Sequence, residues 1–255
     1  MQTFGEALKD WRGQRRLSQL DLGLSANVSA RHISFLETGR SRPSRDMVLR
    51  LCEELSVPRQ VRNQMLSSAG LAPAYARRSL SDADMAPVHE AIDWMLERHA
   101  PFPAFAVDRH WCVQQMNVPA AMMLGGVGVA SGHSLIDALI GNPVMREAIE
   151  NLEEVVIHSI ARLRTESAHL GGDAVLDQAV AALEATMPQA SEASGLLPAF
   201  VPARYRLGDM RLSLLSTITQ FGAAEDIALS ELKIEMMFPA DEATRQALTA
   251  MASTG

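Results

Sequence analysis

The sequence predicts an α+β protein with an all-α N-terminal part and a C-terminal part made of an antiparallel sheet with helices. The first 70 residues parse as short helices with apolar positions at helical spacing. Strand-like alternation and a tight glycine turn follow only after residue 100. The charge balance also changes sign between the two parts, which indicates domains with different partners.

Charge is unevenly distributed along the 255 residues, whose formal net charge is −7. Residues 1–78 hold 13 lysines and arginines against 7 acidic residues, whereas residues 79–255 hold 10 against 23. Only two of the 23 cations are lysines, and the planar arginine fork suits phosphates and guanine edges. Codon usage could explain the preference for arginine but not its segregation. The pattern therefore predicts a polyanionic partner for the N-terminal part.

Five helices are predicted in the N-terminal part, each with a recognisable start or stop. Ser18 and Ser29 are N-cap candidates, and Gly39 suits the left-handed position that follows a helix. The helices span residues 3–16, 19–26 and 29–37, then one that opens at Pro43-Ser44 and one from near Pro58 to before Gly70. We expect a helical domain over residues 1–70 and a linker over residues 71–87, which is rich in proline and alanine.

The C-terminal part, residues 88–255, is predicted to contain about five strands and several helices. Two hairpins are expected, and a further strand is favoured over a helix at residues 231–239, with Leu232, Ile234, Met236 and Phe238 facing inward and Lys233, Glu235 and Met237 outward. The hairpins lie at residues 103–117 and, around Gly208-Asp209, at residues 199–219. Helices are expected at residues 88–99, from Asn117 to Leu124, within residues 143–187 and from Asp241 to Met251, with loops at residues 125–133 and 187–198.

Residues 18–44 have the pattern of a helix-turn-helix, in which the second helix enters the major groove of DNA. That helix buries Ile33 and Leu36. It leaves four residues pointing outward, namely Ala30, Arg31, Ser34 and Phe35. The alternative is an ordinary helical hairpin in a bundle. It does not account for the outward Arg31 or for the arginines that come after the helix, Arg40 and Arg42.

Residues 3–67 resemble the phage-repressor-like (Cro/C1, or XRE) helix-turn-helix family. The resemblance rests on the leading Gln19, the S-x-x-x-I-S-x-L-E run that ends at Glu37, and then Gly39, Arg40, Pro43 and Ser44. It implies that Gln19 docks on a phosphate or base, that Arg31 and Ser34 with Ala30 and Phe35 read base edges, and that Ser29, Arg40 and Arg42 contact phosphates. It also implies an ion pair between Arg12 and Glu37. Because such operators are usually two half-sites of double-stranded DNA, we expect a homodimer.

Residues 88–250 resemble the MmyB-like regulators, through PAFAVDRHWCVQQMN, SLLSTITQFG and IEMMFPADEAT. In that group a repressor-type head is joined to a PAS-like domain, and related domains enclose fatty-acid-like ligands. The 14 methionines fit a pocket of adaptable shape, although methionine also fills irregular cores. The expected ligand-binding residues for a small apolar effector are Met95, Phe105, Met116, Met122, Met123, Leu214 and Met236.

No catalytic set, metal site or cofactor is expected. His89, His99 and His110 are spaced by ten and eleven, which does not place ligands on one helix face. Haem ligation by His110, Cys112 or His133 stays open. A cytoplasmic protein with no membrane partner is expected, because there is no apolar span and no signal-peptide pattern. Two alternatives to a ligand sensor remain: a C-terminal domain that serves only for dimerisation or protein interaction, and an enzyme with a DNA-binding head.

Overall fold

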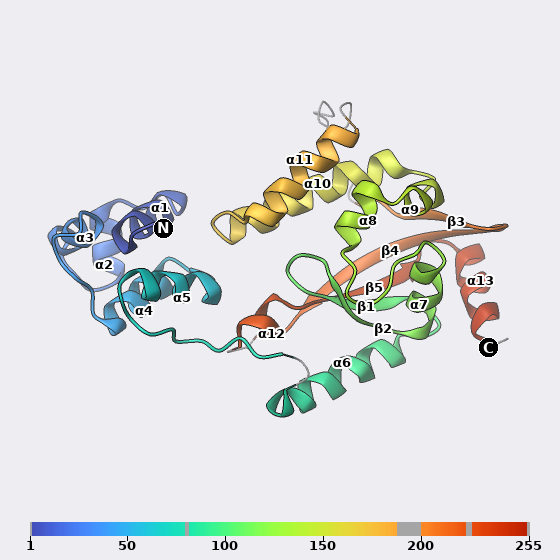
Figure 1. Ribbon diagram of the computed structural model, residues 1–255, viewed down its shortest axis with the longest axis horizontal. Coiled ribbons are helices and arrows are strands. Elements are labelled where there is room, and N and C mark those ends of the chain that lie inside the picture. Colours follow the sequence, from blue (N-terminus) through green and yellow to red (C-terminus); the bar gives the residue numbers. More distant parts are fainter. Residues whose placement is uncertain (1, 80–81, 188–199, 223–225, 254–255) are drawn as a thin grey trace. The chain divides into compact units, whose positions relative to one another are not determined.

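The computed structural model describes residues 2–79, 82–187, 200–222 and 226–253, and the chain divides into two compact units. The first unit is built on residues 1–77 and the second on most of the remaining chain. The first is helical, and the second holds an antiparallel sheet with helices (Figure 1). The α+β prediction is therefore confirmed. The loop expected at residues 187–198 lies almost wholly outside the described residues.

The helical unit contains the five predicted helices within residues 2–77. They are α1 (Phe4–Gln14), α2 (Gln19–Ser25), α3 (Ala30–Glu37), α4 (Arg45–Glu54) and α5 (Arg59–Ser68). Thr3, Ser18, Ser29 and Ser44 cap the first four, because each side chain accepts a hydrogen bond from the backbone of the third helical residue. The two helix starts predicted from the N-cap candidates Ser18 and Ser29 are thus confirmed.

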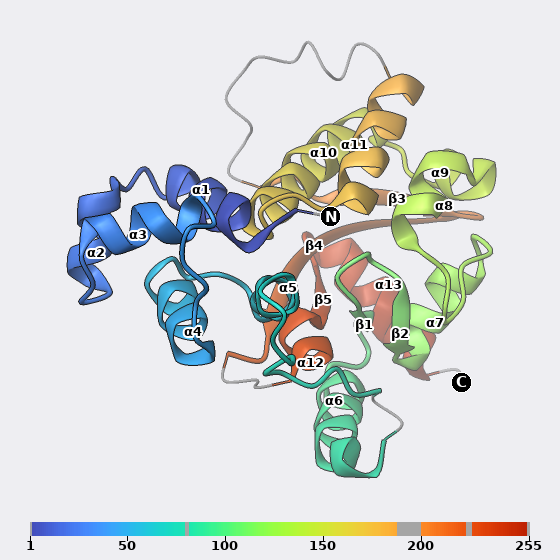
Figure 2. The ribbon, with the colours of Figure 1, turned by 60° about the vertical axis from the view of Figure 1, so that its left-hand side comes forward.

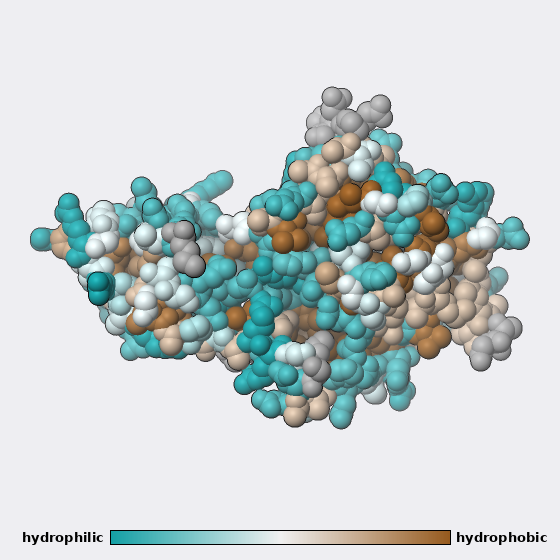
Figure 3. All heavy atoms as spheres, in the orientation of Figure 1, coloured by the Kyte–Doolittle hydropathy of each residue, from teal (hydrophilic) through white to brown (hydrophobic). Residues whose placement is uncertain are grey.

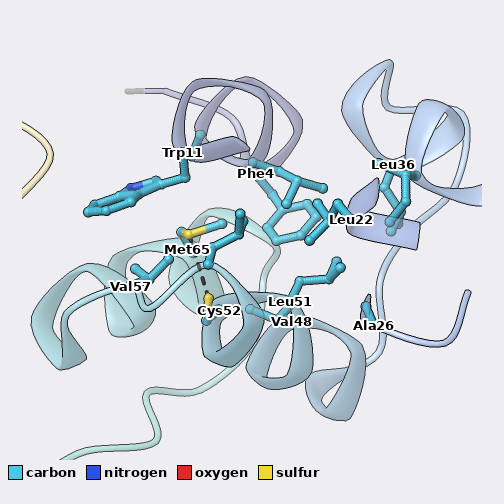
Figure 4. Close-up of a cluster of buried hydrophobic side chains, with 14 of the residues drawn as sticks. Phe4, Trp11, Leu22, Ala26, Leu36, Val48, Leu51, Cys52, Val57 and Met65 are labelled. Carbon is cyan, nitrogen blue, oxygen red and sulfur yellow. Dashed lines mark hydrogen bonds between the residues drawn. The ribbon is translucent and has the colours of Figure 1, made fainter. Parts of the chain in front are cut away.

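A single apolar cluster holds these helices together (Figure 4). Leu8, Leu22, Ile33 and Leu51 are fully buried in it. Around them pack Phe4, Trp11, Ala26, Leu36, Val48, Cys52, Leu55, Val57, Met65 and Leu66. A Cβ added at Gly5 would lie 2.5 Å from the carbonyl oxygen of Glu37, so α1 packs directly on the end of α3. Close packing at Gly5 thus fixes the position of α3.

The segment expected to be a linker, residues 71–87, is partly ordered against the helical unit. Leu71 and Ala74 pack on the helical core. The side-chain oxygen of Asn63 accepts hydrogen bonds from the backbone amides of Ala74 (2.8 Å) and Tyr75 (3.1 Å). At the other end, a short 3₁₀ helix covers Ala83–Met85, and α6 (Ala86–Arg98) begins within the expected linker. Neither end of this segment is free chain.

The sheet of the second unit has the strand order β2-β1-β5-β4-β3, with every neighbouring pair antiparallel. Its strands are β1 (Ala104–Val107), β2 (Val113–Met116), β3 (Ala203–Leu207), β4 (Met210–Gln220) and β5 (Lys233–Pro239). Both predicted hairpins are confirmed, as is the strand interpretation of residues 231–239. Gly208 has φ 61°, as a tight hairpin turn requires.

Helices cover both faces of this sheet (Figures 1 and 2). On one face, Ile92 and Leu96 of α6 pack with Ala104, Ala106 and Ile234. On the other lie α8 (Leu135–Gly141), α9 (Pro143–Ala148), α10 (Leu152–His169) and α11 (Ala174–Thr186). The remaining helices are α7 (Val118–Gly125), α12 (Ile227–Glu231) and α13 (Glu242–Ser253). Hydrophobic residues interrupt the hydrophilic surface around α8 and α10 (Figure 3).

The expected inward and outward sets of β5 need correction. Ile234 is buried as expected, but Lys233, Glu235 and Met237 are also buried. Phe238, expected to face inward, is 38% exposed. Alternation of this kind predicts one buried face and one solvated face. Because helices cover both faces, alternate residues of β5 enter two different interiors, and the face assigned to solvent lines a cavity instead.

Candidate nucleic-acid interface and ligand cavity

The exposed side of α3 carries the four predicted base-reading residues. Ile33 and Leu36 are buried on the opposite side. Arg31 is exposed, whereas Ala30, Ser34 and Phe35 are partly exposed. The Arg31 guanidinium carbon lies 5.2 Å from the centroid of the Phe35 ring, a cation–π distance. This contact aligns the arginine along the helix, with its donors available to a partner.

The phosphate-contacting candidates lie at the two ends of α3. Ser29 caps its beginning, and its hydroxyl accepts a hydrogen bond from the His32 amide at 3.1 Å. Gly39, with φ 71°, ends the helix in the left-handed conformation. Arg40 and Arg42 follow and are exposed. Two permanent cations thus stand at the end of the helix that carries Arg31, an arrangement suited to the backbone of a nucleic acid.

Gln19 begins α2 and contacts Glu37 within the unit. Its side-chain amide donates a hydrogen bond of 2.7 Å to the Glu37 carboxylate. Arg12 donates to the same carboxylate through Nε (2.6 Å) and Nη2 (3.0 Å), which confirms the ion pair implied by the family resemblance. Burial alone would raise the pKa of Glu37, but hydrogen bonds from Arg12 and Gln19 hold the pKa below its ordinary value. Contact between Gln19 and DNA stays a prediction.

The second unit contains a mostly apolar cavity of about 140 Å³ between the sheet and helices α8 to α11. It is comparable with an engineered apolar cavity of roughly 150 Å³ that admits benzene. Its walls come from several elements that are distant in sequence. The lining residues include Phe105, Trp111, Leu124, Leu135, Ile136, Leu139, Met145, Ile149, Val155, Leu163, Leu183, Val201, Ala203, Tyr205, Leu214 and Met237.

Two of the seven expected ligand-binding residues, Phe105 and Leu214, line this cavity. The other five do not. Met95 and Met236 pack with the cluster on the α6 face of the sheet. Met122 is 55% exposed on α7, and neither Met116 nor Met123 reaches the cavity. Methionine lines the cavity at Met145 and Met237, but it does not mark the cavity by itself, because this side chain also fills ordinary core gaps.

The cavity residues missed in the sequence include Val155, Ser159 and Leu163 of α10 and Met237 of β5. The apolar side of the residue 152–163 helix is visible in the sequence, but its pairing with strands that are distant in sequence on both sides is not. The side of β5 that alternation assigned to solvent was therefore overlooked.

Polar side chains also line the cavity, and we call three of them that lie close to one another, His158, Arg162 and Glu235, the polar pole. The Arg162 Nη1 atom lies 4.0 Å from Oε2 of Glu235, whose side chain is 8% exposed. Burial raises the pKa of Glu235, and nearby Arg162, Ser216 and Lys233 only partly oppose this effect. Burial, with the charge of Arg162, lowers the pKa of His158, whose Nδ1 atom is buried without a hydrogen-bond partner.

Trp111 lies beside the polar pole and contacts two cations. The Arg162 guanidinium carbon is 5.2 Å from its ring centroid, and Nζ of Lys233 is 4.0 Å away. Glu166 accepts hydrogen bonds from the Trp111 indole (2.9 Å) and from Lys233 (2.8 Å). Burial lowers the pKa of Lys233, and Glu166 partly offsets this change. Lys233 and Glu166 therefore form a close ion pair at 2.8 Å, whereas Arg162 lies 4.0 Å from the carboxylate of Glu235.

Ser159 is the hydroxyl of α10 that lines the cavity. The Ser159 hydroxyl donates to the carbonyl of Val155 at 2.7 Å, so it is not paired with a general base. In the part of the chain that the structure describes, no group of three or more His, Cys, Asp or Glu residues is placed to hold a metal ion. Nor is any helix of these residues long and apolar enough to cross a membrane.

The two units together define the class of DNA-binding transcription regulators that carry a ligand-binding domain. Residues 3–65 match a helix-turn-helix domain model. Residues 88–251, more than half of the chain, match the MmyB-like transcription regulator ligand binding domain. The chain belongs to this family of MmyB-like transcription regulators. No significant match was found among curated proteins.

Proposed function

We propose that the chain is a sequence-specific, XRE-type regulator that acts in the cytoplasm as a homodimer and responds to a small apolar effector of the fatty-acid class. Its second unit would be a PAS-like domain for ligand binding and dimerisation. The observation that carries the proposal is the mostly apolar cavity, with its polar pole, in a domain on the same chain as a helix-turn-helix. Catalysis forms no part of the proposed function.

DNA recognition is assigned to α3 and its flanks. Arg31, Ser34, Ala30 and Phe35 would read base edges, and Ser29, Arg40 and Arg42 would contact phosphates, with Gln19 at the start of α2 close to the backbone. The outward Arg31 and the cations after α3 support this assignment. A dimer would place two such helices on two half-sites.

The effector would act through the cavity of the second unit. A ligand can shift the affinity for an operator only if it binds the two arrangements of the dimer with different affinity. An apolar chain fits the aliphatic and aromatic walls, since burial of its surface drives binding. Energetic coupling of the cavity to the DNA-binding helices is thus the central claim to test.

The first experiment is native mass spectrometry of the protein purified without added ligand, repeated after denaturation. A small apolar mass that departs only on denaturation, on a dimer, supports both claims. A ligand-free dimer that also binds neither octanoate nor octanol would favour a domain that serves only for dimerisation or protein interaction. A monomer at operator-binding concentrations would contradict the dimer.

The second experiment measures affinity for an operator selected from a random duplex pool, with and without octanoate. Ala203→Phe would fill the cavity from β3, so the effect of octanoate on operator affinity should disappear. Arg206→Phe is the matched control, because it places the same ring on the opposite side of the same strand, at an exposed position. Equal operator affinity with and without saturating octanoate in the unsubstituted protein would remove the proposed switch.

A further inference from the structure

The polar pole is an incomplete hydrogen-bonding site. At 4.0 Å, the contact between Arg162 and Glu235 is longer than a hydrogen bond. The Nδ1 atom of His158 is buried and has no partner, although buried polar atoms in folded proteins are nearly always paired. A ligand group with hydrogen-bond acceptors at this place in the cavity would satisfy both the Arg162 guanidinium and Nδ1 of His158.

The geometry directs these groups to one place. His158 and Arg162 are four residues apart on α10, so they share a side of the helix, and both line the cavity. Glu235 approaches from β5, and the hydroxyl of Ser216 on β4 lies next to it. Trp111 packs against the Arg162 guanidinium and leaves the edge of its planar fork for a partner.

We propose that Arg162 and His158 bind the carboxylate head of the effector. On binding, Arg162 exchanges its contact with Glu235 for a contact with this head, and Glu235 takes up one proton from solvent. This inference rests on the proposed function, since it places the head of a ligand whose apolar chain fills the rest of the cavity. A carboxylate offers two acceptors, which suit the two-pronged guanidinium and a second donor from the neutral imidazole.

Proton uptake follows from the charges around Glu235. From α10 it faces His158, Arg162 and, farther off, Glu166. From the strands it faces Tyr205 of β3 and Lys233 of β5. Lys233 is paired with Glu166, so among the described residues Arg162 is the cation that remains for Glu235 and an added carboxylate. Two buried carboxylates cannot both stay ionised beside one cation without a large cost.

One of the two carboxylates, Glu235 or the ligand head, must therefore take up a proton. Burial already raises the pKa of Glu235, so protonation of Glu235 is the easier of the two. The protonated carboxyl can then donate a hydrogen bond to the bound carboxylate. Binding of a carboxylate should thus weaken as the pH rises above the pKa of Glu235, by about tenfold per pH unit for one proton taken up.

The test compares octanoate with octanol, which has the same chain and no charge, by isothermal titration calorimetry on the full chain across the mildly acidic to neutral range. Octanoate should bind at least about tenfold more tightly than octanol at mildly acidic pH, and its binding should take up one proton once the pH is above the pKa of Glu235. Arg162→Gln should weaken octanoate by about tenfold or more and leave octanol within about twofold. Arg164→Gln, on the same helix and outside the cavity, is the control.

Glu235→Gln distinguishes the proposal from simple entry of neutral octanoic acid. The variant should bind octanoate without proton uptake, and its affinity should no longer depend on pH. If the pH dependence persists in this variant, the ligand carries the proton and the proposal is overturned. The double variant Arg162→Gln with Glu235→Gln removes both charges, so it covers the case in which Arg162→Gln alone fails to fold. It should bind both probes equally.

The outcomes separate this inference from the proposed function. Equal affinity for octanoate and octanol, unchanged in Arg162→Gln, would overturn carboxylate recognition and leave an apolar ligand cavity in place. Failure of both probes to bind the folded protein would count against the cavity as an effector site, and so against the proposed function itself.

Discussion

Arg12 of α1 and Glu37 at the end of α3 form a two-pronged ion pair, with N···O distances of 2.6 and 3.0 Å. The Glu37 side chain is 3% exposed and the Arg12 side chain 14% exposed. A third bond joins Arg12 Nη1 to the carbonyl of Leu17 at 2.8 Å. The pair therefore connects α1, the turn before α2 and the helix that we assign to base recognition.

Removal of this pair should destabilise the helical unit. Arg12→Ala leaves a buried carboxylate that, among the described residues, keeps a side-chain hydrogen bond from the Gln19 amide alone, so we expect a loss of about 3 kcal/mol in the free energy of unfolding. Denaturant unfolding measures it, with the exposed Arg50→Ala of α4 as the control. Because the folded-state pKa of Glu37 is lowered, its stabilisation is present above its ordinary pKa and is lost as the pH falls through the lowered value. Arg12→Ala should reduce this loss of stability at acid pH. Equal free energies of unfolding for Arg12→Ala and Arg50→Ala would contradict a stabilising role of the ion pair.

Base recognition by Arg31 has a specific signature. Arg31→Ala should weaken operator binding by about 1–3 kcal/mol, concentrated at one base position, because the guanidinium contacts base edges. Arg40→Ala should instead weaken all sequences alike and lower the salt slope by about one, as expected for a phosphate contact. Competition binding with single-base operator variants at several salt concentrations separates the two patterns. A uniform loss for Arg31→Ala would reassign it to the phosphate backbone.

The buried Glu235 should make stability depend on pH in the opposite direction to Glu37. Its folded-state pKa is raised by burial, so the stabilisation is complete below its ordinary pKa and is lost as the pH rises through the raised value. In that window the free energy of unfolding should fall by up to about 1.4 kcal/mol per pH unit for this one proton. Glu235→Gln should flatten the slope, whereas the exposed Glu153→Gln should keep it. An unchanged slope in Glu235→Gln would show that another group titrates.

The helical unit could be predicted in detail because its signals are local. Ser18, Ser29 and Ser44 mark helix starts within one turn, and Ile33 with Leu36 marks the buried side of α3. The hairpin around Gly208 is local in the same way. Each of these features depends on residues fewer than ten positions apart.

The cavity depends on distant pairings and could not be predicted in the same way. Glu235 lines it only because α10 covers the side of β5 that a one-sided sheet would expose to water. Its neighbour Met236, an expected ligand contact, packs instead with the cluster on the α6 face. Which face of a strand is covered by which helix depends on the packing of whole elements, and no spacing within β5 encodes it.

The limits of the helical unit lead to a final prediction about a fragment. A fragment of residues 1–77 should fold alone, because its apolar core closes on residues 4 to 66 and is extended by Leu71 and Ala74. A fragment of residues 1–70, the domain that composition suggests, loses those side chains and the bonds from Asn63 to Ala74 and Tyr75. It should therefore unfold at lower denaturant concentration, by a free energy of about 1–3 kcal/mol. Circular dichroism during urea unfolding of both fragments measures the difference, and Asn63→Ala in the longer fragment should reproduce part of it. Equal stability of the two fragments would show that residues 71–77 contribute nothing to the fold of the DNA-binding unit.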